Sequence, residues 1–229
     1  MSSQPWRRYA LGLSIANESL RVHCYDRSGA IISRPYDIHE KPLALIRVIA
    51  SLAFADRNRL GFDPTIRLAL VSDLLSPSLN GPIGRVMGRA PSTVYDILEI
   101  VWSSQGFIGR GTTVYRVRSK EGKEYVLKDY WVKANEAGHE AAILEKIASL
   151  KIDGVPTLVE KWNVQFNGQD DTTETLRKGL IMKHLPASFC ARIHRRLLMT
   201  PVGFPISSFR SQRELLSGLR DVIRSRLNM

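Results

Sequence analysis

The stretch from residue 107 to residue 117, FIGRGTTVYRV, is the feature that most restricts how this chain can fold. Gly109 and Gly111 stand one residue apart, and such a pair marks a place where the backbone turns sharply or lets another group come close. Residues 114–117, VYRV, are β-branched and aromatic, which favours a strand. The chain must therefore place a tight glycine turn directly before a strand.

Three kinds of phosphate-binding turn contain such glycines. A dinucleotide-binding turn needs a third glycine three residues after the second, with a helix starting there, but Val114 occupies that position. A P-loop needs a Gly-Lys-Ser/Thr sequence, which the chain does not contain. The remaining possibility is a glycine hairpin between two strands, as in the loop that covers ATP in protein kinases. Such a hairpin requires a lysine on the next strand.

The segment EGKEYVLKDYW supplies a lysine at this place. Residues 121–123 favour a turn and residues 125–127 favour a strand. Because side chains alternate along a strand, Val126 and Lys128 share one face. Lys128 is then directed toward the glycine turn. Taken alone, the same lysine could simply keep an edge strand soluble.

The following segment, NEAGHEAAILEKIASL, has the periodicity of a helix. Glu140 lies on its apolar stripe together with Leu144, Ile147 and Lys151. No lysine or arginine stands three or four residues from Glu140, so the helix itself offers no partner. A buried carboxylate without a cation costs several kcal/mol. The pattern predicts an ion pair between Lys128 and Glu140, and the alternative is two separately solvated charges.

Ahead of the glycines, the chain favours strands and one helix. Residues 9–15 alternate as a half-buried strand, and residues 20–32 form a second strand and a hairpin that turns at residues 26–29. Residues 43–54, LALIRVIASLAF, favour a helix packed on these strands. Its predicted apolar stripe is Leu45, Ile49, Leu52 and Ala53. Residues 76–93 contain three prolines and three glycines without periodicity, which indicates a long loop.

Composition excludes several classes of protein. The 229 residues are 44% hydrophobic and 24% charged, as in soluble globular proteins, with no long apolar span and no signal sequence at the start. We therefore expect an intracellular protein, cytoplasmic or nuclear, that does not contact membranes. The five histidines lack metal-site spacing, so no metal ligands are predicted.

The net charge of +11 is concentrated near the end of the chain. Residues 177–229 contain eleven basic and two acidic residues. Without a nucleic-acid-binding motif or interleaved aromatic residues, this favours a solvated or partner-facing surface over a nucleic-acid interface.

The ordered motifs together resemble the fungal-type protein kinase domain family, a divergent branch of the protein kinase fold. The resemblance runs from about residue 6 to residue 226, through YALGLSI, GRGTTVYRV, YVLKDYW, HEAAILEKI and HRRLLMTPVGFP. It implies an α+β fold with a kinase-like small lobe, made of a twisted antiparallel sheet and a helix. The implied organisation is a strand-and-helix extension (1–75), a linker (76–93), a small lobe with hinge (94–203) and the start of a mostly absent large lobe (204–229).

The resemblance also implies a partial ATP site. Lys128 would be the phosphate-binding lysine, Glu140 its helix partner, Met199 the residue at the back of the adenine pocket, and residues 200–202 the hinge. The implied cofactor-binding residues are Gly109, Arg110, Gly111, Thr112, Val114, Val126, Lys128, Glu140, Met199, Thr200 and Val202. Val126 stands where an alanine usually lines the adenine pocket.

The chain lacks the catalytic motifs of the family. Kinases use a His-Arg-Asp loop and an Asp-Phe-Gly aspartate that holds magnesium. Here Arg196 follows His194-Arg195, and no aspartate is followed two residues later by glycine. From Gly109 onward 121 residues are present, too few for both lobes.

The sequence therefore predicts a kinase-like fragment that binds ATP weakly and is inactive as given, with no catalytic residues. Magnesium would bind only if a large lobe were supplied. Two alternatives stay open. The chain could act as a non-catalytic scaffold that binds a protein through residues 201–226, or it could bind nucleic acid through its basic last quarter.

Overall fold

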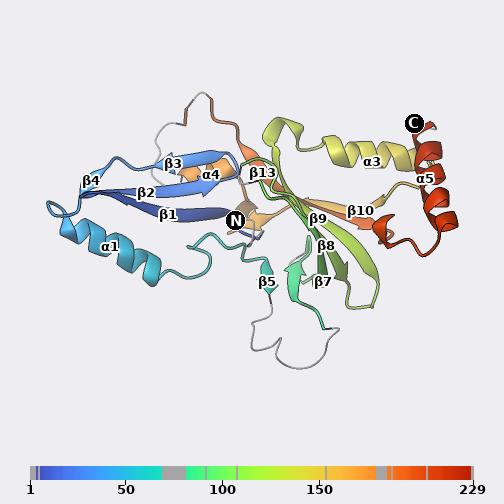
Figure 1. Cartoon of the computed structure of the whole chain (residues 1–229), viewed down its shortest axis with the longest axis horizontal. Coiled ribbons are helices and arrows are strands. Elements are labelled where there is room, and N and C mark those ends of the chain that lie inside the picture. Colours follow the sequence, from blue (N-terminus) through green and yellow to red (C-terminus); the bar gives the residue numbers. More distant parts are fainter. Residues whose placement is uncertain are drawn as a thin grey trace.

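The computed structural model describes residue 4 and residues 6–68, 81–90, 92–106, 108–152, 154–178, 185–186, 188–204 and 206–227. It mixes helices with antiparallel sheets, which confirms the predicted α+β class. Figure 1 shows a small sheet of N-terminal strands at one end, a large sheet in the middle, and helices α3 and α5 at the other end.

The N-terminal strands form the predicted meander in the order β1-β2-β3, with a short β4 also paired to β2. Their bounds are β1 Tyr9–Ala16, β2 Ser19–Asp26, β3 Gly29–Ile32 and β4 Tyr36–Asp37. In the turn between β2 and β3, Asp26 Oδ1 accepts a hydrogen bond of 2.7 Å from the Ser28 N–H, as turn-forming aspartates do. The apolar face predicted for β1 is not fully covered, because Ile15 is more than half exposed.

Helix α1 spans Pro42–Ala53 and begins with a proline, whose fixed φ suits the first turn of a helix. The predicted helix is confirmed, but none of its residues is buried. The predicted apolar stripe is wrong at Ile49 and Ala53, which are exposed. The half-buried side chains include Leu45, Val48 and Leu52, a stripe rotated slightly from the predicted one.

The large sheet is antiparallel and has the strand order β10-β13-β9-β8-β7-β6-β5. The bounds are β5 Ile66–Leu68, β6 Gly84–Met87, β7 Val94–Ser103, β8 Thr113–Arg118, β9 Glu124–Lys133, β10 Thr157–Asn163 and β13 Arg192–Thr200. Strands β7 and β8 flank the glycine turn and pair with each other, so the predicted strand–glycine–strand hairpin is present.

Residues 76–93 were predicted to be a loop, and this is wrong for β6. Gly84 and Val86 are buried while Arg85 and Met87 are exposed, so the strand alternates over four residues, too few to stand out between turn-forming residues. A side chain on Gly84 would collide with the backbone of Arg67, so glycine permits the close pairing with β5. Strand β5, from the predicted extension, belongs to the same sheet. Residues 76–80 and 91 lie outside the described residues.

A buried apolar cluster shows that the large sheet is curled. The cluster contains Ile66 from one edge strand and Trp162 from the other, together with Tyr115, Leu127 and Leu198 from strands between them. Opposite edges of a twisted sheet can share one cluster only when the sheet bends around it. One face of β8, β9 and β13 is therefore sealed inside this core.

The other face of the large sheet carries helix α3, which spans His139–Ser149 and follows a short 3₁₀ turn, η1, at Ala134–Glu136. A second buried cluster joins Ala141 of α3 to Tyr130, Val132, Leu197 and Met199 of the sheet. Glu140 precedes the one buried residue of this helix, so it lies at the border between the packed side and solvent.

Small elements connect β10 to β13. They are β11 Gln165–Phe166, β12 Gln169–Asp170 and α4 Thr173–Lys178. After β13 come η2 Ile206–Ser208 and helix α5, Gln212–Leu227. Among the described helices, none is both long and apolar enough to cross a membrane.

Buried ion pairs join the N-terminal segment to the β10–β13 connection. Arg177 of α4 donates to both carboxylate oxygens of Asp26 at 2.7 and 3.0 Å. Arg8 donates to both carboxylate oxygens of Asp171 at 2.8 and 2.5 Å. Two-pronged contacts of this kind fix orientation as well as distance, so the small sheet is held firmly beside the large one.

Candidate functional site

Lys128 and Glu140 meet on the helix-bearing face of the large sheet. Lys128 lies on β9, where alternation directs it to the same face as Val126, and Glu140 lies in the first turn of α3. The Lys128 ammonium donates a hydrogen bond to Glu140 Oε1. The side chains are 21% and 30% exposed, respectively. The ion pair predicted between them is therefore present, at a position open to solvent on one side.

Arg110 of the glycine turn is a third member of this group. Its guanidinium donates to Glu140 Oε2 at 2.6 Å, so one carboxylate serves two cations. Both cations also lie over the ring of Tyr130, at 5.1 Å for Arg110 and 5.4 Å for Lys128. Partial burial opposes ionisation of Glu140, but the hydrogen bonds and charges of Lys128 and Arg110 lower its pKa below the usual value. The sequence placed Arg110 in the loop without indicating this contact.

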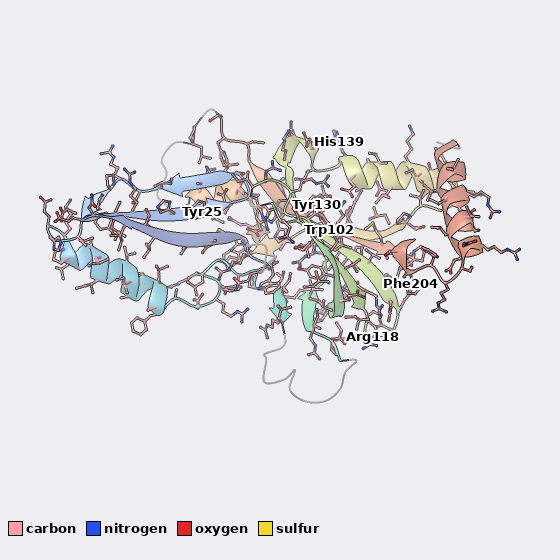
Figure 2. The ribbon with its side chains drawn as sticks, in the orientation of Figure 1. Tyr25, Trp102, Arg118, Tyr130, His139 and Phe204 are labelled. Carbon is pink, nitrogen blue, oxygen red and sulfur yellow. The ribbon has the colours of Figure 1, made fainter. Side chains whose placement is uncertain are left out.

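These side chains line a hollow of about 390 Å³ beside α3. Its charged lining consists of Arg110, Lys128, Lys133, Arg192, Glu136 and Glu140. His139, labelled in Figure 2 at the start of α3, also lines the hollow. Two arginines and two lysines face two carboxylates, so the lining has a surplus of basic side chains. The hollow is suited to an anion such as a phosphate group.

Arg192 adds to this surplus from the start of β13. Its backbone N–H donates to Thr173 Oγ1, but its buried side-chain Nε has no hydrogen-bond partner among the residues that the structure describes. A buried donor left without an acceptor is costly, since it loses water without gaining a replacement. A bound anion in the hollow would supply an acceptor near this donor.

The apolar residues predicted to surround a nucleotide lie on the same sheet face. Val114 pairs with Lys128 across β8 and β9, and Met199 pairs with Val126 across β13 and β9. Thr200 is the last residue of β13, and Val202, two residues further on, is half-buried. The lining of the hollow includes none of these residues. The structure thus brings Arg110, Lys128 and Glu140 together and leaves the predicted adenine-contacting residues outside the hollow.

The glycine turn is closed by backbone hydrogen bonds. The Trp131 N–H donates to Arg110 O at 2.7 Å, and the Ser104 N–H donates to Thr112 O at 2.8 Å. Thr112 is buried, whereas the position of a Cβ at Gly109 is open space. The turn therefore lies against β9, close to Lys128. Phe107, at the start of the predicted motif, lies outside the described residues.

The opposite face of β9 carries a buried ionic network that the sequence did not predict. Asp129 Oδ1 accepts hydrogen bonds of 2.8 Å from both His194 Nε2 and Arg196 Nε. Arg196 also donates to Asp63 Oδ2 at 2.6 Å, and His194 Nδ1 lies 3.1 Å from Asp171 Oδ2. One local sign of this network is visible in the sequence, which is that Arg8, His194 and Arg196 stand within or beside apolar strands.

The network consists of charged groups that stabilise one another. Burial opposes the charged form of His194, but Asp129, Asp171 and Asp63 together raise its pKa to about 9. Burial likewise opposes ionisation of Asp129, yet His194 and Arg196 lower its pKa well below the usual range. His194 is therefore an imidazolium at neutral pH, stacked on Trp131 with ring centroids 4.6 Å apart.

The oxygen and nitrogen atoms of Asp63, Asp129 and His194 approach one another closely enough to suggest metal ligands. The donor set does not fit a metal, because both nitrogens of His194 face carboxylates and so carry protons. Arg196 bonds to both Asp63 and Asp129, which places a guanidinium where a cation would bind. In the described part of the chain, this cluster is an internal salt-bridge network.

Comparison with known proteins gives one match. The family model described as fungal protein kinase matches residues 1–229. Neither the curated proteins nor the solved structures contain a match.

Proposed function

The chain belongs to the fungal protein kinase family, and from that premise we propose that it binds the phosphates of ATP at the Lys128–Glu140 pair. The observation that carries the proposal is the contact of Lys128 with Glu140 beneath a glycine turn, in a hollow with surplus positive charge. In the kinase arrangement the glutamate orients the lysine ammonium toward the α- and β-phosphates. The kinase-like small lobe, with its twisted sheet and single helix, is part of the same proposal.

The remaining predicted residues receive roles by their positions. Gly109, whose Cβ position is open, would let backbone N–H groups approach the phosphates. Val114 and Val126 flank Lys128 on the same sheet face and would cover the sugar and base. Met199, Thr200 and Val202 would lie beside the adenine, outside the hollow that would hold the phosphates.

We propose binding without phosphoryl transfer for residues 1–229. The histidine and arginine that begin a catalytic-loop motif, His194 and Arg195, lie on β13 and are followed by Arg196. Arg196 is buried and bonded to two aspartates, so it has no access to a substrate hydroxyl. Neither His-Arg-Asp nor Asp-Phe-Gly occurs in these residues. A magnesium-binding aspartate and a catalytic base would have to come from outside this sequence.

Nucleotide titration of the whole chain tests the proposal. Saturable but weak binding of ATP is expected for the wild type and should be lost in Lys128→Met. Lys120→Met is the matched control, because Lys120 is exposed in the turn before β9. Each protein is titrated with and without magnesium. Absence of saturable binding to the wild type would remove the proposal, as would equal loss in the control.

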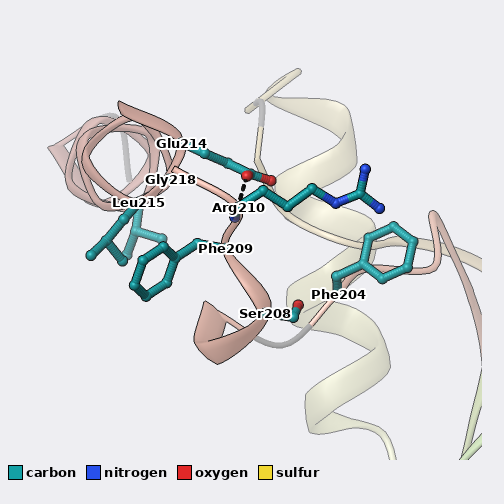
Figure 3. A pocket seen from close by; sticks show the side chains of 8 residues that line it. Phe204, Ser208, Phe209, Arg210, Glu214, Leu215 and Gly218 are labelled. Carbon is teal, nitrogen blue, oxygen red and sulfur yellow. Dashed lines mark hydrogen bonds between the residues drawn. The ribbon is translucent and has the colours of Figure 1, made fainter. Parts of the chain in front are cut away.

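A second candidate function, protein binding by a scaffold, is favoured by the apolar surface around α5. Phe204 is 84% exposed, and Leu216 and Val222 are also more than half exposed. A hollow of about 620 Å³ lies between residues 204–210 and α5, and Lys128 is not part of its lining. Figure 3 shows Phe209 and Leu215 pointing to one side of this hollow and Phe204 lying on the other. The side chain of Ile206, also predicted for this surface, lies outside the described residues.

Such exposed apolar area favours association. Light scattering on purified protein over a wide concentration range tests this candidate. A monomer that stays soluble at high concentration and melts cooperatively would argue against the scaffold function.

A further inference from the structure

The turn between β2 and β3 is locked on both sides. Asp26 is buried and held by Arg177, as described above. Ser28 Oγ lies 2.8 Å from Thr173 Oγ1 and donates to Cys190 O at 2.7 Å. Arg27, between them, therefore has a fixed backbone position relative to the β10–β13 connection.

Arg27 is only 2% exposed, although it carries a guanidinium. Burial lowers its pKa, while the negative charge of Asp129 raises it. Burying such a charge is expensive, so its contacts have to compensate for lost hydration. Hydrogen bonds with the glycine turn are among the contacts of Arg27.

Three residues of the glycine turn contact Arg27. The Gly109 N–H donates to Arg27 O at 2.9 Å, and Arg27 Nη1 donates to Gly106 O at 3.1 Å. The guanidinium lies directly against Gly111, so a Cβ at that position would overlap it. Gly111 also has a φ of +47°, a left-handed value that glycine tolerates best. The group that comes close to Gly111 is thus an arginine of the N-terminal sheet.

The position of the glycine turn determines where Arg110 lies. Arg110 stands between the two contacted glycines, and its side chain reaches the carboxylate that also holds Lys128. Its backbone oxygen accepts from Trp131. Without the Arg27 side chain, the turn would keep its hydrogen bond to Trp131 but lose its side-chain contacts with the N-terminal sheet. Arg110 would then no longer be held beside Lys128.

We propose that Arg27 is a positioning residue, through which the N-terminal sheet holds the glycine turn over the Lys128–Glu140 pair and so sets the affinity for nucleotide. The proposal rests on the function proposed above, because it concerns the same site. Arg27 does not contact the nucleotide itself. Displacement of the β2–β3 turn by a bound protein would weaken the site by the same route.

Two variants of the full chain test the proposal. Arg27→Ala removes the guanidinium, and Gly111→Ala displaces it by adding a methyl group. Each is expected to weaken ATP binding by up to about fivefold, as the loss of Arg110 from the site would. Each should also speed hydrogen exchange in residues 104–112 while α3 stays protected. Arg21→Ala is the matched control, an exposed arginine of β2, the strand that leads into this turn.

The double variant separates positioning from simple destabilisation. If both residues act through one contact, Gly111→Ala should have little further effect on affinity when Arg27 is already alanine. Independent, additive losses, or wild-type affinity and exchange in a folded Arg27→Ala protein, would overturn the proposal. If Arg27→Ala does not fold, Arg27→Lys retains the charge without the guanidinium and is measured in its place.

The outcomes also distinguish this proposal from the proposed function. If the wild type binds no ATP, the nucleotide site is disproved. Hydrogen exchange of residues 104–112 then still decides whether Arg27 positions the turn. Faster exchange in both variants supports the positioning role, and unchanged exchange overturns it.

Discussion

Strand β9 places opposite charges on its two faces, and the two environments differ in access to water. Lys128 and Asp129 are neighbours and so point in opposite directions. Lys128 meets Glu140 beside a hollow that is open to solvent. Asp129 meets His194 and Arg196 in the interior, where its side chain is only 7% exposed.

The balance of charge also differs between the two faces. In the interior network the three carboxylates of Asp63, Asp129 and Asp171 are matched by three cations, which are Arg8, Arg196 and the protonated His194. In the hollow the cations outnumber the carboxylates. A balanced, buried network stabilises the fold and leaves no charge for a ligand. A half-open site with unmatched positive charge contributes little stability and is available to an anion.

The comparison is tested most strongly by removing one cation from each face. Arg196→Met should lower the free energy of unfolding by about 3–5 kcal/mol, because two buried aspartates lose their shared partner. Lys128→Met should lower it by less than about 1 kcal/mol, because a partly exposed pair is screened by water. Urea unfolding followed by circular dichroism measures both values.

Arg85→Met provides the control for loss of an exposed arginine, since Arg85 pairs with Asp96 on the surface of the large sheet. Its effect should be no larger than that of Lys128→Met. Equal destabilisation by Arg196→Met and Lys128→Met would contradict the distinction between the two faces.

The second test uses pH and is directed at the interior network. Because the pKa of His194 is raised to about 9, its contribution to stability is fully present below its unfolded pKa of about 6.5. That contribution is lost as the pH rises through about 9. Urea midpoints measured from pH 6 to pH 10 should therefore fall, and His194→Asn should be less stable and lack this fall.

Cys24 acts in the same direction at higher pH, because burial raises the pKa of its thiol to about 11. The measurement is therefore repeated with Cys24→Ala, which should retain the fall assigned to His194. Direct titration of the His194 ring by NMR gives an independent value. A midpoint near the ordinary histidine value would contradict a protonated imidazole at neutral pH.

The sequence predicted the side of β9 that faces the hollow because its signals are local. The hairpin follows from glycines next to β-branched residues. The Lys128–Glu140 contact follows from a strand pattern and a helix pattern, which place these two residues only 12 positions apart in the sequence. An acidic residue on an apolar helix stripe requires a cation, and the preceding strand contains one. These rules need no knowledge of the rest of the fold.

The interior side was missed because its partners are distant in sequence. Asp129 and His194 are 65 residues apart, and Arg8 and Asp171 are 163 apart. No periodicity links such positions, and the sequence singled out His194 only as a histidine without metal-site spacing and as the start of an incomplete His-Arg-Asp motif. Gly111 is a further example. A glycine at this position indicated that some group comes close, but the sequence could not show that the group is Arg27.

The smallest expected effect comes from Arg110→Gln, which sharpens the comparison within the hollow itself. Arg110 is about half exposed and shares Glu140 with Lys128, so the unfolding free energy should change by less than about 0.5 kcal/mol. ATP affinity should fall by at most about fivefold, the range of an exposed ion pair. Calorimetric titration measures the affinity, with Arg85→Gln as a control that should leave it unchanged. If removing Arg110 instead tightened ATP binding, Arg110 would be competing with Lys128 for Glu140, and the positive surplus of the hollow would not be serving a phosphate.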